Sequence, residues 1–283
     1  MKKFPKITIV TPVLNQVKFI ERTILSVIQQ NYPNLEYIII DGGSSDGTLE
    51  IIETYINNIS TFISEKDDGM YHAIQKGFDQ STGDFMGWIN SDDILLPFSL
   101  FTIAEAFEID ENINWITGIS STIDKQDRII DSRRFRKWSK MNYLLNDYDV
   151  IQQESTFWSR KLWQNVGSKL NLNYKYAAEF ELWTRFFRHE QLYSITAPLG
   201  CFRLRPDEQI SSKYKYEYHE EVNNALASMK QYFRNWKNYR RIIFYNKLAI
   251  LKRSKWFMLH YENLYHYPKQ ISYNYELGAF ILN

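Results

Sequence analysis

Cysteine is almost missing from this chain, and long apolar runs are missing altogether. The 283 residues include one cysteine, Cys201, so no disulfide can form within the chain and a reducing compartment is the simpler interpretation. No local base or metal-ligand spacing accompanies this thiol, and we expect a small buried side chain instead of a nucleophile. No segment approaches the roughly 18 consecutive apolar residues of a membrane-spanning helix.

Acidic residues are missing from residues 222–261. This stretch carries nine basic residues, whereas residues 1–221 carry 24 basic and 31 acidic residues, a net charge of −7. Aromatic residues alternate with the basic ones from Met229 to Tyr261. Two interpretations stay open: the segment binds an anionic membrane surface, or it forms an amphipathic helical pair that packs on the rest of the chain. No nucleic-acid-reading module accompanies it, so we expect no nucleic-acid partner.

Strand and helix patterns alternate along the first 90 residues. Apolar residues with helical spacing separate four short runs that predict strands, which are Ile7–Thr11, Leu35–Ile40, Thr61–Ser64 and Phe85–Ile89. This alternation predicts an α/β fold with a doubly wound, mostly parallel sheet. The basic residues before the first run are not followed by a cleavage site of small residues, so the run is interpreted as a strand and not as a signal peptide.

Polar loops follow these strands at the sheet edge where such folds bind ligands. Asp41 precedes two glycines, and its carboxylate could accept hydrogen bonds from a base or ribose; the alternative is a plain turn before a helix. Asp92 and Asp93 place two adjacent carboxylates after an apolar strand, where a divalent cation would relieve their repulsion; the alternative is an acidic helix start. The first loop lacks Gly-x-Gly-x-x-Gly, which argues against a dinucleotide-dependent oxidoreductase.

Three of these loops resemble the signatures of the family 2 glycosyltransferases, in the same order and spacing. The matching segments are Thr11–Asn15, Asp41–Thr48 and Asn90–Asp93, and Ser64–Gly77 is similar to the family stretch between the second and the third. The resemblance covers about the first 100 residues and continues more weakly to about residue 211. It implies a GT-A fold, an inverting mechanism and an enzyme of the bacterial surface-polysaccharide type that uses Mn²⁺ or Mg²⁺.

The resemblance also implies roles for residues of the first half. Asp41 would lie near the base or ribose of the donor, and Asp92–Asp93 would be the metal-binding DXD element with Asp93 as the direct ligand. The remaining residues expected to bind the nucleotide sugar are Pro12, Asn15, Gly43, Asp67, Lys76 and Asp92. The family often has Asp and Asn where this chain has His72 and Gln75, so the donor sugar stays open.

The second half should supply the general base, because an inverting transfer needs a carboxylate near the acceptor hydroxyl. Residues 177–185 resemble the family segment that carries it, with Glu179 as the first candidate and Glu181 as the second; both could instead be ordinary acidic residues of a first helical turn. Trp158 and Trp183 could stack on an acceptor sugar or pack in the core. Arg205 stands where relatives often have His, and it could neutralise phosphate charge but could not bind a metal.

Together these features predict a metal-dependent glycosyltransferase that moves a sugar from a nucleotide-diphosphate donor to a hydroxyl of a glycan or lipid-linked acceptor. A UDP-sugar is the first candidate for the donor. Residues 1–215 would form the catalytic domain, with a nucleotide-sugar half up to residue 100 and an acceptor half from residue 101. Residues 216–283 would form a helical, aromatic and basic extension. We expect a cytoplasmic protein, peripheral on the inner face of the membrane if residues 222–261 bind lipid. The alternative is a non-catalytic carbohydrate-binding or scaffolding protein on the same fold.

Overall fold

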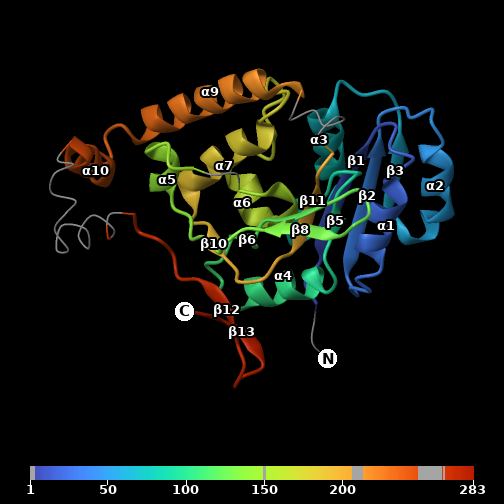
Figure 1. The fold of residues 1–283 in the computed structure, drawn as a ribbon, viewed down its shortest axis with the longest axis horizontal. Helices are drawn as coiled ribbons and strands as arrows, with labels where there is room; N and C mark the ends of the chain where they lie inside the picture. Colours follow the sequence, from blue (N-terminus) through green and yellow to red (C-terminus); the bar gives the residue numbers. More distant parts are fainter. Residues whose placement is uncertain (1–3, 149–150, 206–212, 248–262, 264) are drawn as a thin grey trace.

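A mixed β-sheet forms the centre of the molecule. The computed structural model describes residues 4–148, 151–205, 213–247, 263 and 265–283 (Figure 1). The sheet has the strand order β10-β6-β9-β4-β1-β2-β3, in which β9 runs antiparallel to β4 and β6 while the other pairs are parallel. Its strands are β1 (Ile7–Val13), β2 (Leu35–Asp41), β3 (Thr61–Ser64), β4 (Phe85–Trp88), β6 (Trp115–Thr117), β9 (Thr156–Ser159) and β10 (Tyr193–Ser194). The predicted α/β fold with a mostly parallel sheet is confirmed.

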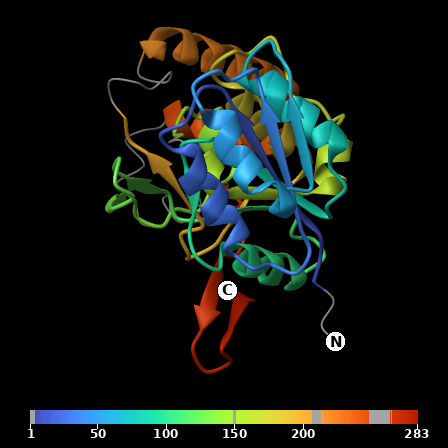
Figure 2. The ribbon, with the colours of Figure 1, turned by 90° about the vertical axis from the view of Figure 1, so that its right-hand side faces the viewer.

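Helices cover both faces of this sheet because its central strands are apolar on both sides. Successive residues of a strand point to opposite faces. Ile9 of β1 accordingly packs in one core with Ile24 of α1, whereas Val10 packs in the other core with Ile74 of α3. The helices of this half are α1 (Ile20–Ile28), α2 (Thr48–Thr54), α3 (Met70–Gln80) and α4 (Ser99–Glu108), and a 3-10 turn η1 (Ile56–Asn58) follows α2. Figure 2 shows α1 and α2 in front of the sheet.

Helix α3 lies unusually close to β1. A Cβ added to Gly77 would come within 2.4 Å of a Val10 methyl carbon, so this position needs a residue without a side chain. The close approach holds α3, which carries Tyr71 in its first turn, against the middle of β1.

A smaller sheet lies next to the main one, where Ser155 Oγ, just before β9, donates a hydrogen bond to the Gly200 carbonyl of the smaller sheet. Its order is β5-β11-β7-β8, formed by β5 (Ile94–Leu95), β7 (Ser121–Ile123), β8 (Ile129–Ser132) and β11 (Gly200–Arg203). Because β11 pairs with β5, the end of β11 lies beside the loop that holds Asp92 and Asp93. The helical elements of this half are α5 (Lys140–Leu144), η2 (Gln153–Ser155), α6 (Arg160–Asn165) and α7 (Ala178–His189).

The C-terminal part consists of two helices and a hairpin. Helix α9 (Lys215–Phe233) lies across the top of the molecule in Figure 1, and its buried residues Val222, Leu226 and Met229 belong to the same core as α7. Helix α10 (Lys237–Lys247) follows, and Ile242 is buried in that core. Strands β12 (Ile271–Asn274) and β13 (Ala279–Leu282) form a hairpin that projects beside α4 (Figure 1).

The apolar face of the described part of the basic segment therefore packs on its own chain, while Lys237, Arg240 and Arg241 of the same part are exposed. Residues 222–247 belong to it, while residues 248–262 lie outside the described part of the structure. The extension contains the expected helices, but it ends in a hairpin that the sequence did not predict. Its two strands are short and mostly half-exposed, and they lie outside the strand–helix alternation that identified the strands of the first half. Among the described residues, no helix has both the length and the apolar character that crossing a membrane requires.

Candidate active site

The first two polar loops are tied together at the carboxyl edge of the sheet. The Asn15 backbone N–H donates to Ser44 Oγ at 2.8 Å, and Asn15 Oδ1 accepts from the Ser45 N–H at 2.9 Å. Asn15 has a φ of 51°, a left-handed conformation that asparagine tolerates better than most residues. The two matched motifs thus form one surface, on which Asn15 and Gly43 are exposed while Pro12 is buried within β1.

Asp41 holds the second loop in shape. Its carboxylate accepts hydrogen bonds from the Gly43 N–H at 2.9 Å, the Ser44 N–H at 3.1 Å and Ser64 Oγ at 2.7 Å. The side chain is fully buried. These bonds fit the turn that the sequence left open as an alternative, and Asp41 would have to give up some of them to bind a base or ribose.

Asp67 and Lys76 border the same surface from the third loop and α3. An added Cβ on Gly42 would lie 2.7 Å from Asp67 Oδ2, so the absence of a side chain at residue 42 lets the Asp67 carboxylate approach the second loop. Asp67 Oδ1 also accepts from the Gly69 N–H at 2.9 Å. Lys76 pairs with Glu65 at 2.7 Å and remains partly exposed. Both predicted donor-side residues are therefore within the loop cluster at this edge.

Asp92 and Asp93 have opposite environments although they are adjacent. Asp92 is partly exposed, and its carboxylate forms an ion pair with the Arg205 guanidinium, which also lies over the Phe19 ring. Asp93 is buried, where Oδ1 accepts from the Arg203 N–H at 2.7 Å and Oδ2 accepts from Asn90 Nδ2 at 3.0 Å. Both Asp93 oxygens accept hydrogen bonds within the protein, so Asp93 would have to give up at least one of them to bind a metal directly.

Asp93 instead shares a hydrogen bond with the buried Glu154 carboxyl group. Burial, followed by the nearby charges of Asp92 and Glu154, raises the pKa of Asp93 well above its usual range. Burial also raises the pKa of Glu154. Two carboxyl groups at hydrogen-bond distance need a proton between them, so this pair is best described as one acid and one carboxylate.

The loop at residues 90–92 contains oxygen atoms of the kind that hard divalent cations bind. Asn90 Oδ1 is buried and has no hydrogen-bond partner among the described residues, so it is an oxygen left for another ligand. Asp92, two residues further along the loop, supplies a carboxylate, and oxygen atoms are the ligands that Mg²⁺ and Mn²⁺ prefer. Within the described residues, no group of three His, Cys, Asp or Glu side chains could hold a metal. A cation here would therefore need oxygen atoms of a bound diphosphate to complete its coordination.

Glu179 lies in the first turn of α7 and receives a hydrogen bond from the Tyr71 hydroxyl of α3. Burial raises the pKa of Glu179 to about 7, partly offset by the bond from Tyr71. A carboxyl group with a pKa near neutrality is well suited to accept a proton and release it again. The structure thus gives Glu179 the environment of a general base.

Glu181, unlike Glu179, is paired with an arginine of its own helix. Its two carboxylate oxygens accept from Arg185 Nε at 2.9 and 3.0 Å within the same helix, and Arg185 continues to the Val166 and Lys169 carbonyls. The second candidate base is therefore held in an ion pair that ties α7 to the preceding loop.

Trp158 and Trp183 belong to the core, which was one of the two alternatives. They are 0% and 1% exposed, and their rings meet edge to face at 5.6 Å. Neither ring is available for stacking on a sugar, so the acceptor-side prediction for both tryptophans is wrong in this structure. Their large apolar area fills the space between β9 and α7.

Sequence reasoning missed Tyr71, Glu154 and Arg203. Arg203 is fully buried; its Nε donates to the Asp92 carbonyl at 2.5 Å, and its guanidinium pairs with Asp127. An arginine within the apolar strand Gly-Cys-Phe-Arg was a usable signal, because a buried charge requires partners. Tyr71 and Glu154 both stood in segments with a family resemblance, but nothing in the sequence indicated which carboxyl groups they would meet.

Comparisons with known proteins agree with this geometry. The model of the Glycosyl transferase family 2 matches residues 8–175. An uncharacterized glycosyltransferase of Haemophilus influenzae is 24% identical over 247 residues, which cover 83% of this chain and 76% of the relative.

Two solved structures share the fold. TarS 1–349 of S. aureus in complex with UDP-GlcNAc has a TM-score of 0.63 and 18% identity over 79% of this chain and 66% of its own. The mannosyltransferase PcManGT of Pyrobaculum calidifontis in complex with GDP-Man and Mn²⁺ has a TM-score of 0.53 and 15% identity over 93% of this chain and 85% of its own. At these identities the likeness shows the fold alone.

Proposed function

Because this chain belongs to glycosyltransferase family 2, we propose that it transfers a sugar from a nucleotide-diphosphate donor to a hydroxyl of a glycan or lipid-linked acceptor, with inversion at the anomeric carbon. A UDP-sugar is the first donor to consider. Support comes from the fold neighbours, of which TarS 1–349 binds UDP-GlcNAc and PcManGT binds GDP-Man. The acceptor class rests on the sequence resemblance.

The environment of Glu179 carries this proposal. The acceptor hydroxyl gives its proton to the Glu179 carboxylate while its oxygen forms a bond to the anomeric carbon. The bond between that carbon and the diphosphate oxygen breaks on the opposite face, and its electron pair leaves with the nucleoside diphosphate. Because the pKa of Glu179 is raised to about 7, the carboxylate is a stronger base than an exposed glutamate, yet about half of it is ionised at neutral pH.

The negative charge of the departing diphosphate is the second requirement of the reaction. Asp92 and Asn90 would hold a Mg²⁺ or Mn²⁺ ion, which neutralises that charge when bound. Arg205 adds a fixed positive charge beside Asp92. Asp93 and Glu154 lie behind these groups and hold the loop, since Asp93 accepts hydrogen bonds from Arg203 and Asn90.

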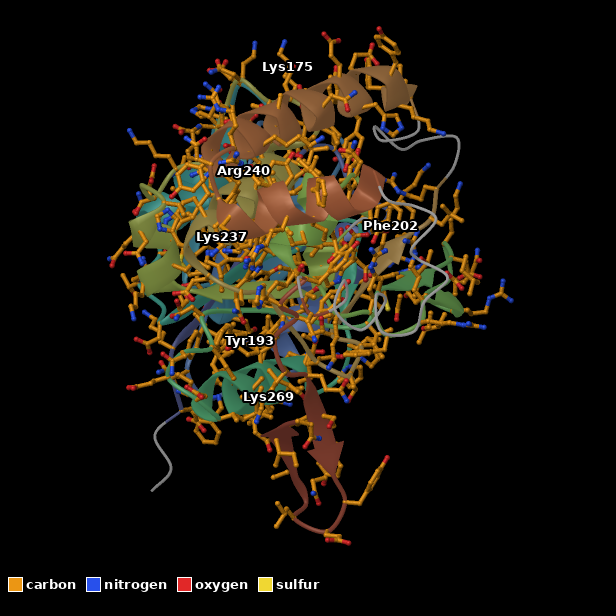
Figure 3. The ribbon with its side chains drawn as sticks, turned by 90° about the vertical axis from the view of Figure 1, so that its left-hand side faces the viewer. Lys175, Tyr193, Phe202, Lys237, Arg240 and Lys269 are labelled. Carbon is orange, nitrogen blue, oxygen red and sulfur yellow. The ribbon has the colours of Figure 1, made fainter. Side chains whose placement is uncertain are left out.

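Residues 222–261 are proposed to bring the enzyme to an anionic membrane surface that carries a lipid-linked acceptor. Lys237, Arg240 and Arg241 are exposed on α10, and Figure 3 labels the first two on the side of the molecule that α9 and α10 cross. The Tyr232 and Phe244 side chains are 57% and 59% exposed in the same region. Exposed cations and aromatic rings together are typical of interfacial binding.

The test is release of nucleoside diphosphate from a panel of UDP- and GDP-sugars, with and without Mn²⁺. We expect release from one donor class, dependent on the divalent ion and increased by an acceptor glycan. Absence of both release and binding across the panel would contradict the proposed activity.

A further inference from the structure

We propose that Glu221 of α9 is a positioning residue for the Glu179 base, so that the C-terminal extension completes the active site. This inference rests on the proposed function of Glu179. Its basis is a carboxylate that accepts hydrogen bonds from three consecutive backbone N–H groups just before α7.

The three hydrogen bonds have short and similar lengths. Glu221 Oε1 accepts from the Lys175 N–H at 2.7 Å, and Oε2 accepts from the N–H groups of Tyr176 and Ala177 at 2.9 and 2.8 Å. Helix α7 begins at Ala178, so the last of these bonds lies two residues before Glu179. A carboxylate that bridges three backbone donors holds the direction in which the helix starts. The direction of that first turn decides where the Glu179 side chain points.

Two further contacts hold α9 against α7 along their length. The Tyr214 ring, directly before α9, stacks on Tyr176 with a centroid distance of 4.8 Å. Towards the other end, Arg188 Nη2 donates to Ser228 Oγ at 3.1 Å. Between them, Val222 and Leu226 of α9 are buried with residues of α7. Glu221 is thus fixed on a packed helix, whereas a carboxylate on a mobile tail would hold nothing in place.

Glu221 also acts on Glu179 through its charge. Its negative charge contributes to the raised pKa of Glu179, after burial and Glu154. The other groups that face Glu179 are the hydroxyls of Tyr71 on α3, Tyr143 on α5 and Tyr218 on α9. Of these, Tyr71 favours the ionised form of Glu179 through its hydrogen bond.

The test compares Glu221→Gln with the matched control Glu220→Gln. Glu220 is the exposed neighbour on α9, and its replacement removes the same charge from the helix without touching the loop. Glutamine at residue 221 offers one acceptor oxygen and an NH₂ group that would face the N–H donors. We expect kcat to fall about tenfold to a hundredfold, the usual effect of misplacing a catalytic group by up to about 1 Å. The KM for the nucleotide sugar should stay close to that of Glu220→Gln. The melting temperature should fall below that of Glu220→Gln but stay well above the assay temperature, because backbone N–H groups lose their acceptor.

Two readouts separate positioning from a loss of stability. The midpoint of the acidic limb of the kcat profile should move to lower pH in Glu221→Gln, because removal of a like charge favours ionised Glu179. Hydrogen exchange at the amides of Lys175, Tyr176 and Ala177 should become faster. Glu221→Asp, which keeps the carboxylate, should recover part of kcat and keep the wild-type midpoint.

A double-mutant comparison tests whether the effect passes through Glu179. If it does, Glu179→Gln with Glu221→Gln should turn over no more slowly than Glu179→Gln alone. Additive losses, or unchanged kcat and amide exchange in Glu221→Gln, would overturn the inference. If the wild type transfers no sugar at all, the proposed function fails instead, and the amide-exchange comparison still decides whether Glu221 holds the loop.

Discussion

Replacement of Glu179 by glutamine tests the proposed chemistry most directly. Glutamine keeps the size of the side chain and can accept the hydrogen bond from Tyr71, so the fold around α7 should be preserved. It cannot accept the acceptor's proton. A positioned general base typically contributes about 10²–10⁴-fold, and we expect kcat to fall by that factor while the affinity for the nucleotide sugar stays unchanged.

The dependence of the wild-type kcat on pH is a second, independent test of Glu179 as the base. With a Glu179 pKa of about 7, the ionised fraction falls about tenfold for each pH unit below that value. The rate constant kcat should therefore be about a tenth of its plateau at pH 6 and about a hundredth at pH 5. It should reach half of its plateau near pH 7 and become independent of pH above about pH 8. An exposed glutamate would instead leave the rate flat down to its ordinary pKa of about 4.3.

The assay is the initial rate of nucleoside diphosphate release with saturating donor and acceptor, from pH 5 to 9. Glu181→Gln is the comparison variant, because Glu181 lies two residues away but is paired with Arg185. A profile that stays flat between pH 5 and 7 would refute the assigned environment. A large loss in Glu181→Gln with an active Glu179→Gln would refute the assignment of the base.

Three further predictions concern the donor side, the hydrogen bond to the base and the basic segment. Calorimetry should show that Mn²⁺ no longer increases the UDP affinity of Asp92→Asn. The increase should persist in Asp93→Asn, because Asp93 already behaves as a buried acid. The reverse pattern would identify Asp93 as the metal ligand. Tyr71→Phe should raise the midpoint of the pH profile above 7, because the lost hydrogen bond favours ionised Glu179; a midpoint at or below the wild-type value would contradict this. Binding to liposomes should require anionic lipid and weaken with added salt. It should also fall when four basic residues, Arg240, Arg241, Lys252 and Arg253, are changed together to serine. Activity on a soluble acceptor should survive these changes.

The fold of the first half followed from the sequence because its central strands, β1 and β2, are buried on both faces. Where strand and helix patterns alternate along a chain, an almost continuous apolar run such as Leu35–Ile40 is typical of a buried parallel strand. In the structure, β2 spans Leu35–Asp41. The C-terminal hairpin gave no comparable signal. Its strands are short and partly exposed, and they are held by contacts from distant residues, such as the hydrogen bond from the Phe280 N–H to Glu105.

Residue types in the candidate site could be predicted, but their environments could not. The sequence places Asp92 and Asp93 side by side without telling which one is buried, since that depends on β11, about 110 residues further along. The same limit applies to Trp158, whose burial is decided by α7. Glu179 was found through the resemblance, whereas its hydrogen bond from Tyr71 and the nearby charge of Glu221 come from α3 and α9 and have no local pattern.

Four carboxyl groups of the candidate site differ in environment, and this difference also controls the charge that an incoming diphosphate meets. They are those of Asp92, Asp93, Glu154 and Glu179. Four ionised carboxylates at one sheet edge would repel a diphosphate before any cation arrived. Burial keeps a proton on the pair of Asp93 and Glu154, and Arg205 offsets the charge of Asp92. Glu179 is half protonated at neutral pH because its pKa is about 7. The edge therefore carries much less negative charge than its composition suggests, and the group best able to lose its remaining proton is the one beside the proposed acceptor.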